Sequence, residues 1–462
     1  MLRILALTVL AMVSIQAADL TAKLDAILAE VPAGGLASVV VADCASGAVL
    51  YRHRADRPLM LASTTKLLIT AAALRGLGAD YRFRTRLVAL GPVSDGTLPG
   101  LGVIGGGDPT FDEHFNDDRN PARIFADWAA RLKAAGVRRI QGDLVIDARL
   151  FSGPIRPDTY PKDAENIQRW YSAPASAFAW SDNCIEVRAL PGKAGAPCRI
   201  ETRPHSPRIQ IDNRTSTGAG KVIIGRAKTT NTVTVSGSTA TATDWFPLAI
   251  AEDPDLLAGD ELKYQLGLAG IAVTGAVRLD AVDPEAGRTL IDHRSDLAPA
   301  LRLMNQRSQN FYGEQVLRLI GVAGGGRGSL EDGLSAARTN LEKLVGKDAG
   351  PITLMDGCGL SYGNSASAGT LVRLLTVMAG DKIFVESLKE EKKYDLSGAH
   401  GRVKTGTLAV AVCLAGYVEA DGRRHAFALL FNRGESTRWY WATGLRDRCY
   451  AAIAAHVAAS AR

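Results

Sequence analysis

Residues 61–70 read Leu61-Ala62-Ser63-Thr64-Thr65-Lys66-Leu67-Leu68-Ile69-Thr70. The apolar run after Lys66 predicts a buried helix, and residues three positions apart lie on one helix face, so the Lys66 amine is expected to reach the Ser63 hydroxyl. The positive end of the helix dipole favours negative charge developing there. The segment therefore predicts a nucleophile beside its base, although a capping serine followed by a surface lysine is the commoner origin of this pattern when it stands alone.

Two further motifs follow in the order that such a site requires. Ser308-Gln309-Asn310 ends an amphipathic stretch, and Lys404-Thr405-Gly406-Thr407 begins an apolar strand. By itself a Ser-x-Asn fragment carries little information, and Lys-Thr-Gly-Thr fits a turn entering an edge strand. Together and in this order, the three motifs match the serine acyl-transfer signature of penicillin-binding proteins and serine β-lactamases.

The spacing of the motifs predicts an insertion. Ser63 and Ser308 are 245 positions apart (308 − 63), far more than a helical subdomain between them requires. Ser308 and Lys404 are only 96 positions apart (404 − 308), enough for a few helices and a return to the sheet. We therefore expect one α/β catalytic domain built from both ends of the chain, with extra structure between the first two motifs.

With these motifs the chain resembles the class C low-molecular-mass penicillin-binding proteins, the D-alanyl-D-alanine carboxypeptidase/endopeptidase family. The resemblance covers nearly the whole mature chain. It extends to Gly105-Gly106-Gly107-Asp108-Pro109-Thr110, Ser176-Ala177-Phe178, Asp182-Asn183, Gly270-Ile271, Val273-Thr274-Gly275 and Asp356-Gly357-Cys358-Gly359-Leu360-Ser361.

The resemblance implies an α/β (α+β) fold of the serine β-lactamase and penicillin-binding-protein transpeptidase type, with a large β-rich insert forming additional domains. We expect the catalytic domain to comprise residues 19–80 and 290–462, and the insert residues 81–289. Within the insert, the family leads us to expect two smaller domains, one nested in the other.

The resemblance also implies a reaction, acyl transfer from a peptide ending in D-Ala-D-Ala. The expected catalytic residues are Ser63, Lys66 and Ser308, and the expected substrate-binding residues are Asn310, Lys404, Thr405, Gly406 and Thr407. Ser63 would attack the penultimate carbonyl while Lys66, as a free amine, takes its proton. That role requires a lowered Lys66 pKa, which the nearby Lys404 charge and burial would both favour.

The other groups have supporting roles in this expectation. Ser308 would relay a proton to the leaving amine, and Asn310 would hold a substrate amide. The backbone N–H groups of Ser63 and Thr407 would form the oxyanion hole, and the Lys-Thr-Gly-Thr strand would accept an extended peptide at its edge.

Three residues depart from the family pattern and keep alternatives open. Cys358 stands where serine is usual, Tyr362 where arginine is usual, and Gln309 where aspartate is usual. A β-lactamase would need a deacylating base, and no Glu-x-x-x-Asn run lies between the second and third motifs. A wall-binding or β-lactam-sensing protein with weak catalysis remains open, as does an esterase or amidase of the same fold.

The N-terminus predicts export. A basic tip, an apolar run from Ile4 to Ile15 and a small-residue exit at Ala17-Ala18 form a secretory signal peptide, expected to comprise residues 1–18. We expect a protein of the periplasm or cell envelope with no integral membrane segment after cleavage. Its partners would be D-Ala-D-Ala peptides of peptidoglycan and β-lactam antibiotics.

Composition excludes other classes. A chain of 462 residues with 47% hydrophobic and 22% charged residues is globular and long enough for two or three domains. The net charge of +6 suits work beside anionic wall polymers or lipid headgroups, or merely solubility, and with no nucleic-acid motif we expect no nucleic-acid partner.

The cysteines and histidines predict no metal site. The seven histidines show no HExxH or paired-ligand spacing and the six cysteines form no CxxC, so we expect neither a metal nor a cofactor. Cys184 and Cys198 flank a turn-rich stretch and are expected to form a disulfide across a hairpin. A bond between Cys44 and Cys449 is a second, less favoured pairing.

Hydrophobic patterning predicts the main elements of the catalytic domain. It indicates a first helix over 20–31 and a hairpin of 36–41 with 48–53. Helices are expected from 295 to 402, followed by two strands, 403–418 and 424–431, and a last helix over 444–462.

Overall fold

The structure is a computed structural model that describes residues 19–285, 287–392, 398–433 and 440–460. Contacts divide the chain into two compact units, the first made of residues 1–79, 298–309 and 333–462 and the second of residues 80–297 and 310–332. The expected signal peptide lies outside the described residues. Among the helices that are described, none combines the length and apolar character needed to cross a bilayer.

The first unit is built on a six-stranded sheet in the order β19-β20-β21-β22-β1-β2, antiparallel throughout. Its strands are β1 (Gly35–Asp43), β2 (Val49–His53), β19 (Lys389–Glu391), β20 (His400–Leu408), β21 (Ala411–Ala420) and β22 (Arg423–Arg433). The central strands are buried on both faces, so they are almost continuously apolar instead of alternating.

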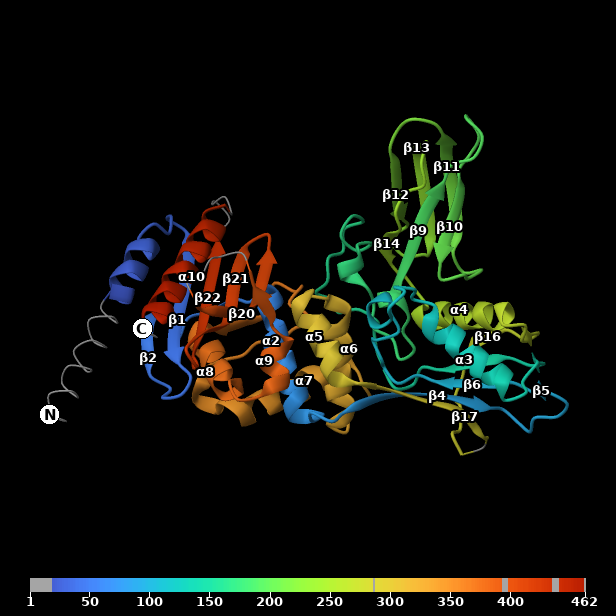
Figure 1. Cartoon of the computed structure of the whole chain (residues 1–462), viewed down its shortest axis with the longest axis horizontal. Coiled ribbons are helices and arrows are strands. Elements are labelled where there is room, and N and C mark those ends of the chain that lie inside the picture. The colour runs from blue at the N-terminus through green and yellow to red at the C-terminus, as the bar shows by residue number, and fades with distance from the viewer. Residues whose placement is uncertain (1–18, 286, 393–397, 434–439, 461–462) are drawn as a thin grey trace. The chain divides into compact units, whose positions relative to one another are not determined.

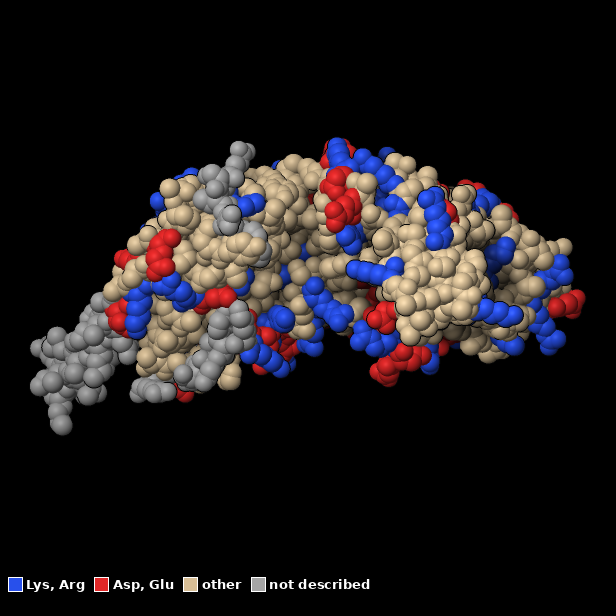
Figure 2. Space-filling view, turned by 90° about the horizontal axis from the view of Figure 1, so that it is seen from above, with Lys and Arg blue, Asp and Glu red and all other residues tan. Residues whose placement is uncertain are grey.

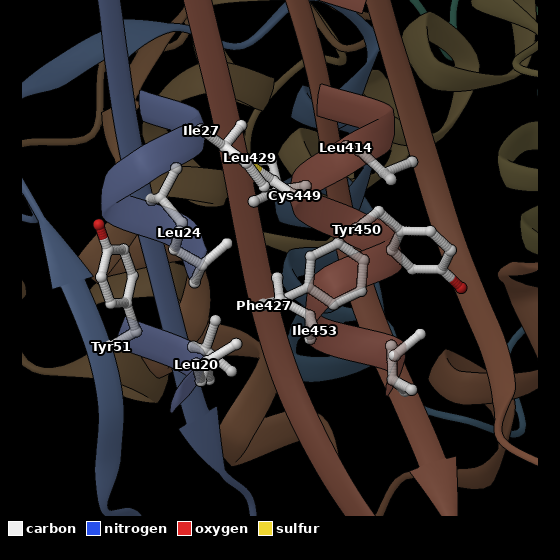
Figure 3. Close-up of a cluster of buried hydrophobic side chains, with 14 of the residues drawn as sticks. Leu20, Leu24, Ile27, Tyr51, Leu414, Phe427, Leu429, Cys449, Tyr450 and Ile453 are labelled. Carbon is white, nitrogen blue, oxygen red and sulfur yellow. The ribbon is translucent and has the colours of Figure 1, made fainter. Parts of the chain in front are cut away.

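One face of this sheet is covered by α10 (Tyr440–Ser460) and by the helical residues 19–28 (Figure 1). Leu20, Leu24 and Ile27 recur at helical spacing and pack on the sheet residues Phe427 and Leu429 (Figure 3). The expected first helix is therefore confirmed, three residues shorter at its C-terminal end than the pattern indicated.

The first unit also contains several helices, two short turns and a small second sheet. They are α2 (Thr65–Gly76), α5 (Leu297–Gln306), α7 (Leu330–Val345, whose first residues belong to the second unit), α8 (Ala368–Met378) and α9 (Lys382–Ser387), with short 3-10 turns η1 (Ala62–Thr64) and η5 (Lys347–Ala349) and a small sheet of β3 (Pro58–Met60) and β18 (Ser365–Ser367). Successive side chains along β20 point to opposite faces of the sheet, which decides the face on which Lys404 lies. Val403 belongs to the apolar cluster under α10, so the Lys404 side chain points to the opposite face.

The single strand expected over 403–418 is wrong. The chain turns back at Ala409-Val410, so this stretch forms the β20–β21 hairpin, in which Leu408 pairs with Ala411. Neither turn residue is Gly, Pro, Asn or Asp, the residues that usually signal a hairpin, and the apolar pattern runs through the turn without a break.

The second unit contains a five-stranded sheet, β16-β8-β6-β4-β17, and a three-stranded sheet, β15-β7-β5. Their elements are β4 (Arg82–Ala89), β5 (Thr97–Leu98), β6 (Leu101–Ile104), β7 (Arg139–Ile140), β8 (Leu144–Asp147), β15 (Ala272–Val273), β16 (Val277–Leu279) and β17 (Thr289–Asp296), with helices α3 (Arg123–Ala134), α4 (Pro254–Leu268) and α6 (Asn310–Ala323) and turns η2 (Glu113–Phe115), η3 (Trp170–Ser172) and η4 (Ser181–Asn183). Phe125, Trp128 and Phe178 form the aromatic centre of its core.

Two three-stranded sheets of the second unit lie together (Figure 1). Their buried side chains form a small core of their own. The two sheets are β10-β9-β14 and β11-β13-β12, made of β9 (Cys184–Leu190), β10 (Arg199–Arg203), β11 (Gln210–Thr217), β12 (Val222–Arg226), β13 (Thr232–Thr239) and β14 (Phe246–Ala249). Val187, Val233, Val235 and Leu248 fill this core from alternating strand positions.

The disulfide expected between Cys184 and Cys198 is wrong, because the two thiols lie at opposite ends of the β9–β10 hairpin. Leu190 pairs with Arg199, which puts Cys198 beside the turn, whereas Cys184 starts β9 and pairs with Ala249. At about 3.3 Å per residue, the six steps along β9 separate them by roughly 20 Å. Both are free thiols, as are Cys44 and Cys449, so the second pairing is wrong as well.

The charge of the protein is dispersed over the face seen from above. Lys and Arg side chains alternate with Asp and Glu side chains there and do not merge into one basic field (Figure 2). Ion pairs occur throughout the part of the chain that the structure describes, for example between Arg188 and Glu201 and between Arg214 and Asp212.

Candidate active site

Ser63 sits in a strained turn at the start of α2. Ala62 has φ +48°, a left-handed conformation that costs a non-glycine residue free energy and that persists where the surroundings hold it. Two threonine hydroxyls provide that support: Thr64 Oγ1 donates to the Leu61 carbonyl at 2.6 Å and Thr65 Oγ1 to the Ala62 carbonyl at 2.8 Å. The half-buried Ser63 is thereby presented at a fixed position ahead of the helix.

Lys66 lies one turn later with its side chain fully buried. Its Nζ is 3.4 Å from Ser63 Oγ and donates to the Cys358 carbonyl at 2.6 Å. The contact with Ser63 is long, which is common for catalytic hydrogen bonds before substrate binds. A base and a nucleophile are thus paired, with a third group orienting the base.

Ser308 of the second motif meets the third motif within the first unit. Ser308 follows α5 in a left-handed conformation, φ +59°, and its Oγ accepts a hydrogen bond from Lys404 Nζ at 2.9 Å. Lys404 Nζ also donates to the Thr405 carbonyl at 2.8 Å. Burial, and then the charges of Lys66 and Lys389, lower the pKa of Lys404 well below its ordinary value.

Gly406 brings strand β20 against the backbone of the Ser63 turn. A Cβ at this position would lie 2.7 Å from the Leu61 carbonyl oxygen, 3.0 Å from Thr64 N and 3.1 Å from Ser63 N. Only glycine permits this approach, which puts the Ser63 N–H next to the strand that carries Thr407. The flanking Thr405 and Thr407 are exposed and share the face of β20 opposite to that of Lys404.

The outer edge of β20 is open beside the motif. Among the described residues, β19 pairs only with Gly401, Arg402 and Val403, so no strand covers positions 404–408 on that side. An exposed strand edge of this kind accepts an extended peptide as a further strand.

Asn310 falls in the second unit. It is the first residue of α6, and its Nδ2 donates to the Tyr171 carbonyl at 2.9 Å. The structure therefore brings Ser63, Lys66, Ser308 and the Lys404–Thr407 strand together within the first unit and gives Asn310 a partner within the second.

Two contributions were missed by sequence reasoning. The Cys358 carbonyl that orients Lys66 is a backbone group, which no residue type signals. Gly359, with φ +86°, lies so close to the Ser63 turn that an added Cβ would be 1.9 Å from the Ala62 carbonyl oxygen. The glycine at 359 was a usable signal, since glycine marks positive φ or close backbone approach.

A serine and a lysine one turn apart, a second serine bonded to a second lysine, and a Lys-Thr-Gly strand against the nucleophile define the penicillin-binding-protein class of serine acyl-transfer proteins. The chain belongs to the D-Ala-D-Ala carboxypeptidase 3 (S13) family, whose family model matches residues 20–439. The class and family expected from the motifs are confirmed.

Known proteins agree with this membership. The chain is 32% identical to a D-alanyl-D-alanine carboxypeptidase of Actinomadura sp., over 90% of this chain and 81% of that protein. It is 25% identical to the D-alanyl-D-alanine carboxypeptidase DacB of Haemophilus influenzae, over 92% of this chain and 89% of that protein. The crystal structure of penicillin-binding protein 4 (dacB) from Haemophilus influenzae has the same fold, with a TM-score of 0.75 at 22% identity, covering 93% of this chain and 99% of that one.

Proposed function

We propose that this protein is a serine D-alanyl-D-alanine carboxypeptidase, or an endopeptidase on the same bonds, acting on peptidoglycan stem peptides through an acyl-enzyme on Ser63. The observation that carries the proposal is the gathering of Ser63, Lys66, Ser308 and Lys404 in one unit of a chain that belongs to the D-Ala-D-Ala carboxypeptidase family.

Acylation follows from these contacts. Lys66 as a free amine accepts the Ser63 proton while Ser63 Oγ attacks the carbonyl of the penultimate D-Ala. The N–H groups of Ser63 and Thr407 stabilise the oxyanion. Losing one such donor typically costs about 3 kcal/mol in the transition state. Ser308, bonded to Lys404, relays to the departing D-Ala amine the proton that Lys66 took from Ser63, and water then releases the acyl group.

Substrate binding uses the open edge of β20. The stem peptide adds as a strand beside residues 404–408, and the exposed Thr405 and Thr407 receive the terminal carboxylate. Lys404 supplies positive charge there when it is protonated.

We propose that the protein works in the periplasm or cell envelope, exported by residues 1–18, with peptidoglycan peptides as substrates and β-lactams as covalent inhibitors. The β-lactam proposal is supported by the fold shared with a penicillin-binding protein solved in complex with a β-lactam, at a TM-score of 0.70. We further propose that residues 81–289 act as two smaller domains, the β9–β14 sheets being the nested one.

The test is release of D-Ala from a muropeptide ending in D-Ala-D-Ala, followed by chromatography, together with labelling by a fluorescent penicillin. Wild type is expected to release D-Ala and to take up one penicillin per chain. Ser63→Ala is expected to do neither, while its free energy of unfolding changes by no more than about 1 kcal/mol, the usual net worth of one hydrogen bond, here the one that Ser63 Oγ accepts from Lys66.

The alternatives give different results in the same experiment. A stable penicillin adduct without D-Ala release would support a β-lactam-sensing protein, and rapid loss of the adduct with hydrolysed penicillin would support a β-lactamase. Turnover of other D-amino-acid esters or amides without D-Ala release would support an esterase or amidase. Stoichiometric labelling of Ser63→Ala would refute the assignment of the nucleophile.

A further inference from the structure

The turn of residues 356–364 contacts the Ser63 helix at three successive points. The Asn364 carbonyl accepts the Leu61 N–H at 3.1 Å, before the helix begins. Gly359 packs against the Ala62 carbonyl. The Cys358 carbonyl accepts the Lys66 amine at 2.6 Å, shorter than the 3.4 Å from that amine to Ser63 Oγ. The turn therefore gives the proposed base a hydrogen bond that is shorter than the contact of the base with Ser63.

Asp356 organises this turn from a fully buried position. Its Oδ1 accepts the N–H groups of Cys358 at 3.2 Å and Gly359 at 2.7 Å and the Asn364 Nδ2 at 2.9 Å. Its Oδ2 accepts the Ser361 N–H at 2.6 Å. Four donors converge on one carboxylate, which leaves the turn a single arrangement in which every one of them is satisfied.

We propose that Asp356 is a positioning residue for the Lys66 base, acting through the Cys358 carbonyl; the proposal rests on the proposed roles of Ser63 and Lys66. Asp356 draws the N–H groups of residues 358 and 359 toward itself, and the Cys358 carbonyl is thereby directed at Lys66.

The chemistry of an amine explains why this direction matters. A neutral lysine amine has two N–H bonds and one lone pair, and only the lone pair can accept the Ser63 proton. With one N–H committed to the Cys358 carbonyl, rotation about the last side-chain bond is restricted and the lone pair can remain toward Ser63. If the carbonyl moves, the amine loses this orientation, and displacements of about 1 Å can slow catalysis roughly a hundredfold.

The experiment measures the first-order acylation rate constant of Asp356→Asn at saturating penicillin, from pH 5 to 10 by stopped flow. Asparagine keeps the size of the side chain but replaces one acceptor oxygen with an N–H₂ donor, which opposes the backbone donors. We expect the rate constant to fall roughly tenfold to a hundredfold. We also expect its acid limb to move to lower pH, because a carbonyl acceptor favours the ammonium form and is lost.

A second variant and a control distinguish a positioning effect from misfolding of Asp356→Asn. A first-order rate constant does not depend on how much of the protein is folded. Asn364→Ala removes one of the four donors to Asp356 and is expected to show a smaller effect in the same direction. Asp381→Ala removes a carboxylate that caps α9 through the Phe384 N–H, and its acylation profile is expected to match wild type.

Three outcomes would overturn the proposal. They are acylation of Asp356→Asn within twofold of wild type, a loss by the same factor at every pH, or a shifted profile in Asp381→Ala. If Ser63→Ala is still labelled, the proposed function fails first; if Ser63→Ala is silent and Asp356→Asn behaves as wild type, only this inference fails.

Discussion

A single methyl group at position 406 is expected to separate the two halves of the proposed oxyanion hole, the N–H groups of Ser63 and Thr407. In Gly406→Ala the new Cβ would stand 2.7 Å from the Leu61 carbonyl oxygen and 3.1 Å from Ser63 N, both of them backbone atoms that cannot rotate away. Ordinary contact begins near 3.4 Å, so β20 must retreat from the Ser63 turn by roughly 0.7 Å.

The retreat carries the Thr407 N–H away from the Ser63 N–H. Losing one oxyanion donor typically costs about 3 kcal/mol in the transition state, which corresponds to a rate about a hundredfold lower. Overpacking is expected to cost a further ~1–3 kcal/mol in the free energy of unfolding. The acylation rate should therefore fall much more than the folded fraction does.

The assay is stopped-flow acylation by a fluorescent penicillin, paired with urea unfolding. Gly444→Ala is the matched control, since that glycine lies within α10 and an added Cβ meets nothing within 4 Å. It should raise the free energy of unfolding by about 0.5–1 kcal/mol and leave acylation unchanged. Acylation of Gly406→Ala within twofold of wild type would refute the oxyanion role inferred from the close approach.

Three other expectations concern Lys404, the terminal carboxylate of the substrate, and the thiols. The lowered pKa of Lys404 means that the unfolded chain binds more protons than the folded one between that pKa and the ordinary lysine value near ~10.4, so the free energy of unfolding should rise with pH there. Lys404→Met should reduce the slope of unfolding free energy against pH by up to about 1.4 kcal/mol per pH unit, measured by urea unfolding at several pH values. An unchanged slope would contradict the lowered pKa of the buried Lys404 amine. Amidating the terminal carboxylate of a D-Ala-D-Ala peptide should lower kcat/KM for D-Ala release roughly ten- to a hundredfold, whereas equal rates would favour cross-link cleavage over carboxypeptidase action. Alkylation of unfolded, unreduced protein followed by peptide mapping should modify both Cys184 and Cys198, and a linked peptide pair would contradict the hairpin register.

The side chains proposed as catalytic could be singled out from the sequence because their proposed chemistry requires particular residue types. Ser63 and Lys66 had to share one helix face, and Lys404 had to lie on a strand, so order and spacing pointed to them. The expectation that Lys404 begins its strand was wrong, because β20 starts four residues earlier, at His400. The first helix and the apolar strands of the central sheet were likewise visible as periodic runs.

The features that the sequence did not predict depend on the backbone conformation. The Cys358 carbonyl is identical in chemistry to every other carbonyl, and only the folded turn directs it at Lys66. The β20–β21 turn at Ala409-Val410 lacks turn residues, because its geometry is imposed by pairing on both sides. The cysteine pairing failed since composition does not specify strand register.

The pairing of β1 with β22 has a consequence for the timing of assembly. Gly35 pairs with Arg433, so the strand that precedes the nucleophile has its neighbour at the far end of the chain. Chains emerge from synthesis N-terminus first, and contacts between distant segments form late and slowly. The Ser63 helix is made early but cannot rest on a finished sheet until almost the whole polypeptide has appeared. A nascent or truncated chain would consequently lack a working peptidase, which delays hydrolytic activity until the protein is complete.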